Sequence, residues 1–392
     1  MHRFLAAVAA GIWGAACLAA TATEPPRESF DLRVPFAPAY FSVDGRQRLV
    51  YELHVNNYAA DALEPITVVV IDADRGDVLL REEAAELTRH LDLSGLQRPV
   101  VDPGGIAPGR RGIVFVELAI APRRPLPKHL RHRVEYRVAA TASPVHAVEG
   151  GDVTVRSQPA AVLGAPLRGG PWVAVYDPDW ERGHRRVAFA VGGKARTPGR
   201  HAADWVLIDT NGRKQSGEGH LAEATYSYGQ EVLAVADGTV VKVRDDLPER
   251  RLLTERAQHD LATGSGNVIA LAIGSGRFAY YGHLRTGSAR VRVGQRVRKG
   301  DVIAQVGFSG SASDPQLHFH LGDAPDALAA EGLPFVFEHF HTLGRYRDIT
   351  KMGRLPWTST EDGTRAQRRR EMPAGNSVVD FGGGDATGIT PR

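Results

Sequence analysis

Residues 314–323 read DPQLHFHLGD, and this stretch decides the expected fold and the candidate chemistry of the chain. Its alternation is typical of a β-strand, because neighbouring side chains of a strand point to opposite faces. One face would carry Leu317, Phe319 and Leu321, and the other Gln316, His318 and His320. Imidazoles are common zinc ligands and proton carriers. The alternative is a half-buried strand with incidental histidines, so the rest of the chain has to decide.

Length and composition indicate a globular protein with more than one folded unit. At 392 residues, two domains with appendages are expected. The content of 43 glycines and 24 prolines favours turns and short strands over long helices. The formal net charge of +3 is nearly balanced and does not indicate a nucleic-acid partner.

The N-terminus predicts export. His2 and Arg3 precede an apolar run over residues 4–20, and the small residues 20–22 (ATA) follow. This pattern predicts a cleaved signal peptide over residues 1–22 and no stable membrane span. Cys17 is the sole cysteine, and its lipidation stays open. We therefore expect an exported protein of the periplasm or cell envelope, without disulfides.

The first predicted domain, residues 24–163, is all-β. Residues 49–55 alternate, and the apolar runs 66–71, 113–120 and 134–139 are bounded by turn residues. Several short strands at this spacing predict a β-sandwich, for which an immunoglobulin-like arrangement is a candidate. Residues 82–91 are a candidate helical insertion. No cluster of catalytic residue types occurs here, so we expect a binding, spacing or positioning module.

A linker over residues 164–172 leads into a second predicted domain, residues 173–346, of antiparallel β-structure with little helix. Asp237-Gly238 joins two alternating runs within residues 231–243 and predicts a hairpin. A second strand pair, 267–273 and 278–284, is joined by Gly274-Ser275-Gly276. Residues 347–392 are expected to be a partly disordered extension, with a solvated charged run at 361–370 and a last strand at 376–381.

Three blocks resemble the lysostaphin-type (LytM-like) zinc metallopeptidases: GQEVLAVADGTVVKV (229–243), YYGHL (280–284) and GQRVRKGDVIAQVGFSGSASDPQLHFH (294–320). The resemblance covers about residues 188–340. It implies a β-rich domain, a zinc cofactor and peptidoglycan cross-bridges as substrate. Glycine-rich hairpins of lipoyl and biotinyl carrier domains are also similar, but those need a lysine at the hairpin tip, where this chain has Asp237-Gly238.

The resemblance assigns Asp204, in GRHAADW, and His318 as zinc ligands. The family's first ligand stands four residues before the aspartate, where this chain has Arg200, which stays protonated and cannot bind zinc. His201, three before, would need a bulge or turn to reach the same face. His320 is a further candidate, about 6.5 Å along the strand from His318 at about 3.3 Å per residue.

Two residues match the family's positions for acting on substrate and water. His283 in YYGHL corresponds to the middle catalytic histidine. Gln316 replaces the first histidine of the His-x-His pair, and an amide can donate a hydrogen bond to an oxyanion but cannot take up a proton.

Two function classes stay open. The first is a zinc metalloendopeptidase that acts on peptidoglycan cross-bridges with altered or impaired catalysis. The second is a degenerate module that binds peptidoglycan or regulates another cell-wall hydrolase. Arg200 and Gln316 argue against ordinary activity, whereas the joint presence of Asp204, His283 and His318 argues for a working pocket.

Overall fold

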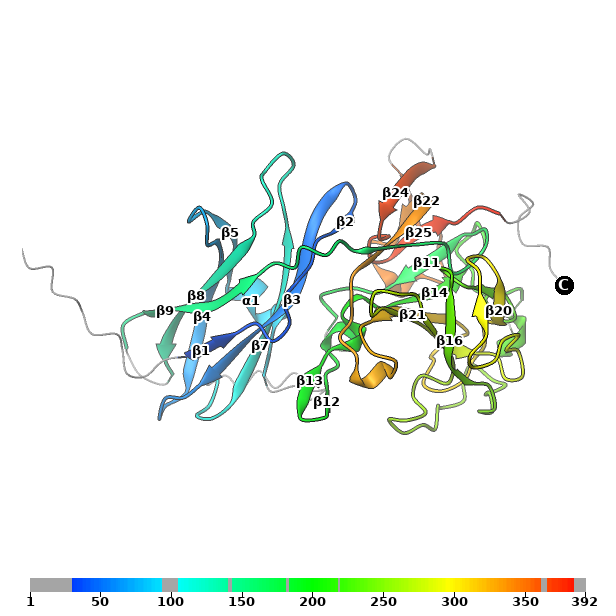
Figure 1. Ribbon diagram of the computed structural model, residues 1–392, viewed down its shortest axis with the longest axis horizontal. Coiled ribbons are helices and arrows are strands. Elements are labelled where there is room, and N and C mark those ends of the chain that lie inside the picture. The colour runs from blue at the N-terminus through cyan, green and yellow to red at the C-terminus, as the bar shows by residue number, and fades with distance from the viewer. Residues whose placement is uncertain are drawn as a thin grey trace, which may run out of the picture.

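The computed structural model describes residues 30–93, 105–139, 143–180, 183–217, 219–360 and 365–383. The predicted signal peptide and Cys17 lie outside these residues. Two β-rich halves lie side by side along the long axis (Figure 1). The prediction of an all-β protein is confirmed, and the described residues contain one short α-helix, α1 (Ala84–His90), where a helical insertion was predicted. Within the described residues no helix is long and apolar enough to cross a bilayer.

The N-terminal half contains two antiparallel sheets. One has the order β1-β3-β7-β6 with β2 beside β3, and the other the order β5-β4-β8-β9. Their strands are β1 (Phe30–Arg33), β2 (Phe41–Val43), β3 (Arg46–Asn57), β4 (Leu63–Asp72), β5 (Val78–Glu83), β6 (Leu91–Leu93), β7 (Arg111–Ala119), β8 (His129–Val138) and β9 (His146–Thr154). Leu49, Tyr51, Leu53 and Val55 are fully buried and share one core with β4, β7 and β8. The immunoglobulin-like arrangement stays a prediction.

A buried histidine in this core provides a pH-sensitive contact. His132 on β8 is fully buried. Its Nδ1 lies 3.0 Å from the carbonyl oxygen of Gly151, and its Nε2 2.8 Å from the Tyr51 hydroxyl. A carbonyl only accepts, so Nδ1 donates and Nε2 accepts from Tyr51. Burial lowers the pKa of His132 to about 4, so the folded protein holds it neutral.

We therefore expect acid to destabilise the protein through His132. An unfolded histidine has a pKa of about 6.5, so between about pH 6.5 and 4 the unfolded chain binds the extra proton. Stability should fall in this window by up to about 3 kcal/mol. His132→Gln keeps a donor and an acceptor, and should flatten this part of the pH profile in urea titrations. Equal slopes for both proteins would contradict the assignment.

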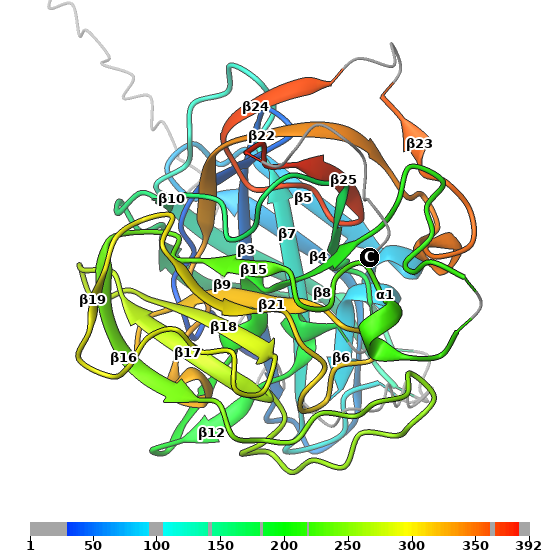
Figure 2. The same cartoon turned by 90° about the vertical axis from the view of Figure 1, so that its right-hand side faces the viewer.

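The C-terminal half is built on a twelve-stranded sheet whose main path is β10-β22-β25-β11-β14-β21-β18-β17-β16-β19. These strands, with β23 and β24 beside β22, are β10 (Ala161–Leu163), β11 (Trp172–Val175), β14 (Ala203–Leu207), β16 (Gly238–Arg244), β17 (Asn267–Ala272), β18 (Phe278–Leu284), β19 (Arg296–Val297), β21 (Leu317–Gly322), β22 (Phe335–Arg345), β23 (Thr358–Ser359), β24 (Ala366–Glu371) and β25 (Ser377–Asp380). Figure 2 shows β16, β17, β18 and β21 side by side.

Smaller elements flank this sheet. Two separate strand pairs are β12 (Phe189–Val191) with β13 (Lys194–Arg196), and β15 (Glu231–Leu233) with β20 (Val302–Gln305). The 3-10 helices are η1 (His184–Arg186), η2 (Pro198–His201), η3 (Ala222–Ala224), η4 (Ala327–Ala329) and η5 (Ile349–Lys351). The elements η1 and η2 lie next to the candidate site described below.

The alternation of the 314–323 stretch is confirmed. Leu317, Phe319 and Leu321 are fully buried in the main core of the C-terminal half. β21 pairs with β14 on one side, where Asp204 is opposite His318, and with β18 on the other, where Gly282 is opposite His318. β21 therefore lies between β14 and β18, and both of these strands carry other candidate site residues.

The Asp237-Gly238 hairpin prediction is wrong. β15 pairs with β20, whereas β16 pairs with β17 and β19. Asp237 instead accepts a hydrogen bond from the Lys299 amide at 2.8 Å, so the turn is fixed by the loop before β20. The strand pair around Gly274–Gly276 formed as predicted, as β17 and β18.

The antiparallel arrangement predicted for residues 173–346 is confirmed, because every strand pair described within that range is antiparallel. The parallel pair β10 and β22 includes residues 161–163, which precede that range. One further expectation needs correction. The charged run is not simply a solvated segment: residues 366–371 form β24 on β22. The last strand formed as β25, between β11 and β22. Residues 361–364 and 384–392 lie outside the described residues.

Candidate metal centre

A carboxylate between two imidazoles forms the centre of the candidate site. Oδ1 of Asp204, on β14, lies 2.8 Å from Nδ1 of His318, on β21. Its Oδ2 lies 3.0 Å from Nε2 of His184, at the start of η1. One ligand atom of each residue lies within 4.8 Å of the other two, and among the described residues this is the group that could hold a metal ion.

The donor set fits a zinc ion. Catalytic zinc is held by three protein ligands of the histidine and carboxylate types, with a further position left for water or substrate. His184, Asp204 and His318 supply two imidazole nitrogens and one carboxylate oxygen from three different segments. His184 is the most accessible, with 36% of its side chain exposed, against 12% for Asp204 and 13% for His318.

Charge and hydrogen bonding set the protonation of the cluster. Burial acts to raise the pKa of Asp204, but the two imidazoles hold the pKa of this carboxyl well below its ordinary value. Burial acts to lower the pKa of His184, but the neighbouring Asp204 carboxylate raises it. Burial lowers the pKa of His318, against the opposing effect of Asp204. The carboxylate is therefore ionised at neutral pH and ready to act as a ligand.

Gln316 and His320 lie on either side of His318 along β21. Gln316 donates from Nε2 to Oδ2 of Asp204 at 2.9 Å, so its amide orients the carboxylate. Nδ1 of His320 lies 3.0 Å from Nε2 of His318, and its ring stacks on Tyr280 at 4.6 Å. Burial lowers the pKa of His320 well below its ordinary value, which keeps the ring neutral. His320 contacts the candidate ligand His318 and is not a member of the three-residue cluster.

His283, on β18, adds a neutral imidazole beside the cluster. Its ring centroid lies 5.8 Å from that of His318. Nδ1 donates to the Ser309 carbonyl at 3.0 Å, so Nε2 carries the free lone pair. Burial lowers the pKa of His283 to about 4. Its backbone φ of 58° lies in the left-handed region, which is unfavourable for a bulky residue and is often found at functional sites.

The structure does not bring His201 into the cluster. Residues 198–201 form the turn η2, and the His201 ring packs edge-on against Phe41 at 5.0 Å, in the N-terminal half. Burial and the Arg200 charge lower the pKa of His201 well below its ordinary value. His201 and Asp204 both line a second cavity of about 370 Å³, but His201 is not a member of the three-residue cluster.

Arg200, at the position of the family's first ligand, has a different set of contacts. Its guanidinium pairs with Glu52 at 2.7 Å and with Glu331 at 2.9 Å, and all three side chains are buried. It also donates to the Gly332 carbonyl at 3.1 Å. Arg200 thus joins β3 of the N-terminal half to the C-terminal half.

His184 was missed by sequence reasoning. It lies 20 residues before Asp204, in a charged turn with no metal-binding spacing. Its ring is perpendicular to that of His318, with centroids 4.7 Å apart. The only signal was a histidine within an ordered stretch at the start of the second domain. Its proximity to Asp204 is created by tertiary structure.

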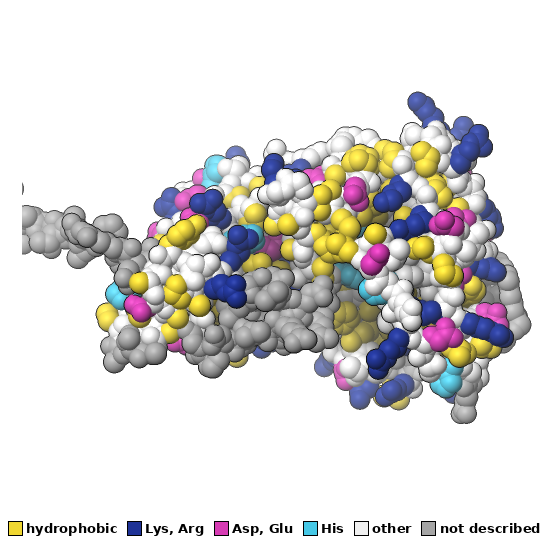
Figure 3. Space-filling view, turned by 90° about the horizontal axis from the view of Figure 1, so that it is seen from below, with side chains coloured by type: hydrophobic (Ala, Val, Ile, Leu, Met, Phe, Trp, Pro, Cys, Tyr) yellow, Lys and Arg dark blue, Asp and Glu magenta, His cyan; other side chains and the backbone are white. Residues whose placement is uncertain are grey.

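A cavity of about 440 Å³ opens over the cluster. Its lining includes the four histidines at positions 184, 283, 318 and 320, together with apolar side chains of Phe189, Leu261 and Leu328. Figure 3 shows a hollow with histidine side chains at its rim. A chain segment entering this hollow would reach the candidate ligands and His283 together.

Comparison with known proteins gives a family match in this half of the chain. Residues 222–328 match the sequence profile of Peptidase family M23. The match includes His283, Gln316, His318 and His320 and begins after His184 and Asp204. The chain is also similar to the murein hydrolase activator EnvC of Escherichia coli (strain K12), with 36% identity over 95 residues. That segment is 24% of this chain and 18% of the relative, so less than a fifth of the relative is matched.

The solved structures found in the comparison have lower sequence identity to this chain. The catalytic domain of lysostaphin from Staphylococcus simulans is 18% identical, with a TM-score of 0.23, over 42% of this chain and 88% of that chain. A zinc-containing peptidase from Vibrio cholerae is 15% identical, with a TM-score of 0.22, over 77% of this chain and 86% of that chain.

Proposed function

We propose that this chain, whose residues 222–328 match the sequence profile of Peptidase family M23, is an exported zinc metalloendopeptidase of the cell envelope that cuts cross-bridge peptides of peptidoglycan. The observation that carries the proposal is the convergence of His184, Asp204 and His318 into one cluster, with His184 and His318 lining a cavity that His283 also lines. The domain boundaries predicted from the sequence are kept as part of this proposal.

Each residue of the site has a separate role in the proposed reaction. His184, Asp204 and His318 would hold zinc, which supplies a Lewis acid that polarises a peptide carbonyl and activates water. His283 has its Nε2 lone pair free and is unprotonated at neutral pH, because burial lowers its pKa to about 4, so it can accept a hydrogen bond from the attacking water. A pKa this far below neutral makes it a weak base. Gln316 orients Asp204 and cannot transfer a proton, so proton transfer depends on His283. The loss of a second proton carrier is consistent with altered catalysis.

The proposal predicts metal-dependent release of peptides from purified peptidoglycan. Wild-type protein should lose this activity after dialysis against a chelator and regain it with zinc. His318→Ala and His184→Ala should each reduce release by at least about 100-fold, since an open zinc site needs all three ligands. His201→Ala is the matched control and should retain zinc-dependent release. Equal release by wild type and His318→Ala would remove the peptidase proposal.

A second candidate is a regulator of another cell-wall hydrolase, with peptidoglycan as a binding partner. Gln316 in place of a histidine and the similarity to a murein hydrolase activator favour it. The two candidates separate in one experiment, in which the protein is incubated with peptidoglycan alone and then together with a purified cell-wall hydrolase. Release only in the second case, unchanged in His283→Ala, favours the regulator.

A further inference from the structure

The segment that carries His184 is a short turn outside the large sheet. η1 is a three-residue turn without a side-chain cap, and it lies outside the large sheet. Asp204 and His318, by contrast, are on paired strands in the C-terminal half. The cluster therefore has two ligands on a rigid sheet and a third on a short turn. The contacts that hold this turn therefore determine the position of the third ligand, His184.

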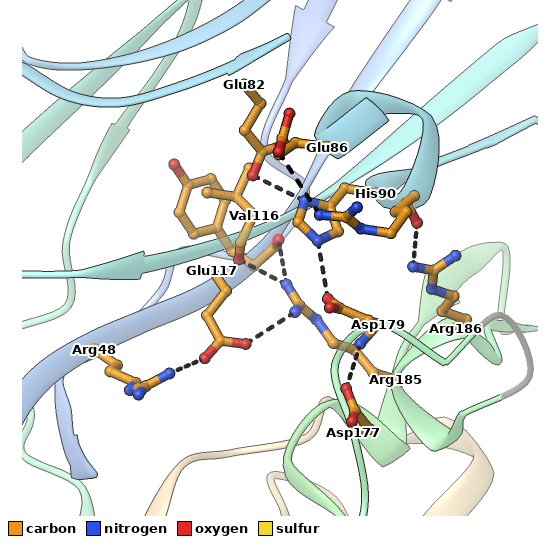
Figure 4. A network of polar contacts seen from close by, with 12 residues as sticks. Arg48, Glu82, Glu86, His90, Val116, Glu117, Asp177, Asp179, Arg185 and Arg186 are labelled. Atoms are coloured by element: carbon orange, nitrogen blue, oxygen red, sulfur yellow. Dashed lines mark hydrogen bonds and ion pairs between the residues drawn. The ribbon is translucent and has the colours of Figure 1, made fainter. Parts of the chain in front are cut away.

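The residue after His184 anchors the turn in the other half of the molecule. Arg185 is only 6% exposed, and its Nη2 donates to the carbonyl oxygens of Val116 at 2.6 Å and Tyr51 at 3.3 Å. Its Nη1 lies 3.8 Å from Glu117, and its guanidinium lies over the Phe115 ring at 5.6 Å. All of these partners are on β3 and β7 of the N-terminal half (Figure 4).

Further contacts hold the same segment on both sides of Arg185. Arg186 donates to the Arg89 carbonyl and lies over the Phe115 ring at 5.0 Å. Earlier in the chain, Asp179 pairs with Nε2 of His90 at 2.9 Å. Figure 4 shows the contacts of Asp179, Arg185 and Arg186 as one network between the two halves. Because bonds to a charged, buried guanidinium are among the stronger ones, this network restrains the turn.

From this geometry we infer that the N-terminal half positions the third metal ligand: Arg185 docks into the N-terminal sheet and thereby places His184 against Asp204. The inference rests on the proposed metal site. It makes zinc binding and docking of the two halves mutually dependent, since a ligand that binds the docked state better must stabilise that state. The N-terminal half is then a working part of the metal site, and Arg185 is a positioning residue.

The test measures the zinc dissociation constant of the full chain by competition with a chromogenic chelator. Arg185→Ala should raise it by about 10- to 100-fold, the usual effect of removing a group that orients a ligand. Glu117→Gln removes a charge and keeps the side-chain shape, and it should raise the dissociation constant by a smaller factor. It is the variant to measure if Arg185→Ala does not fold. Circular dichroism of the zinc-free variants establishes folding.

Arg368→Ala is the matched control. Arg368 pairs with Asp44 at 3.8 Å and so also joins the two halves, but it is on β24 and contacts neither η1 nor the cluster. It should leave the dissociation constant within about 3-fold of wild type, an ordinary exposed-pair effect. An equal weakening by Arg368→Ala would mean that general loosening, not placement of His184, is responsible, and would overturn the inference.

A double-mutant cycle separates positioning of His184 from general damage. If Arg185 acts through His184, adding Arg185→Ala to His184→Ala should weaken zinc binding no further. Full additivity overturns the inference, as does an Arg185→Ala protein that binds zinc as wild type does. If wild type takes up no zinc, or His184→Ala binds it normally, the proposed metal site itself fails. Binding that needs His184 but not Arg185 removes the positioning role alone.

Discussion

Replacing Asp204 with asparagine is expected to lower the affinity for zinc by at least about 100-fold, at or beyond the upper end of effects seen for groups that only orient a ligand. Asp204 accepts hydrogen bonds from His184, Gln316 and His318 at 2.8–3.0 Å. An asparagine of the same size has one acceptor oxygen and one amide donor. At least one of the three donors would then face another donor, and the ligand charge would be gone.

The same substitution should destabilise the zinc-free protein by about 1–3 kcal/mol, because a buried donor loses its acceptor. Zinc binding by calorimetry and urea denaturation in the presence of chelator measure the two effects separately. Asp314→Asn is the control: Asp314 pairs with Lys214, outside the cluster, and its loss should change zinc affinity by less than about 2-fold. Unchanged zinc binding by Asp204→Asn would place the metal elsewhere in the chain.

The parts of the site that the sequence predicted are those encoded by short-range patterns. The alternation around Leu317 and Phe319 follows from strand geometry and fixes which face His318 occupies. Asp204 and His283 were found because their strands carry recognisable blocks. Within one strand, the position of a residue in the sequence determines the face to which its side chain points. Such residues can therefore be identified from the sequence alone.

The parts that were missed depend on contacts between distant segments. His184 contacts Asp204 across 20 residues of sequence, and the next residue, Arg185, is bonded to the N-terminal sheet; no spacing rule relates these positions. The Asp237-Gly238 signal failed for a similar reason, since β15 pairs with β20 in a separate two-stranded sheet and β16 pairs with β17 and β19 in the large sheet. Local turn preference was overridden by tertiary pairing.

Arg200 is the residue whose replacement should most reduce stability. Burial acts to lower the pKa of its guanidinium, but Glu52 and Glu331 raise it, so all three groups are charged partners. Their side chains are 3–4% exposed. Arg200→Ala would leave two buried carboxylates without their cation and should cost about 3–5 kcal/mol in urea denaturation. Arg33→Ala, which breaks an exposed pair with Asp31, should cost less than about 1 kcal/mol.

The effect of the two unpaired carboxylates on the stability of Arg200→Ala can be separated from simple loss of packing. Arg200→Met combined with Glu52→Gln and Glu331→Gln removes all three charges while keeping similar volume, and should recover most of the lost stability, because replacing a whole buried ion cluster by neutral groups is often tolerated. A triple variant as unstable as Arg200→Ala would show that the ion cluster is not the reason. Recovery would mean that Arg200, four residues before Asp204, affects stability through its ion cluster with Glu52 and Glu331.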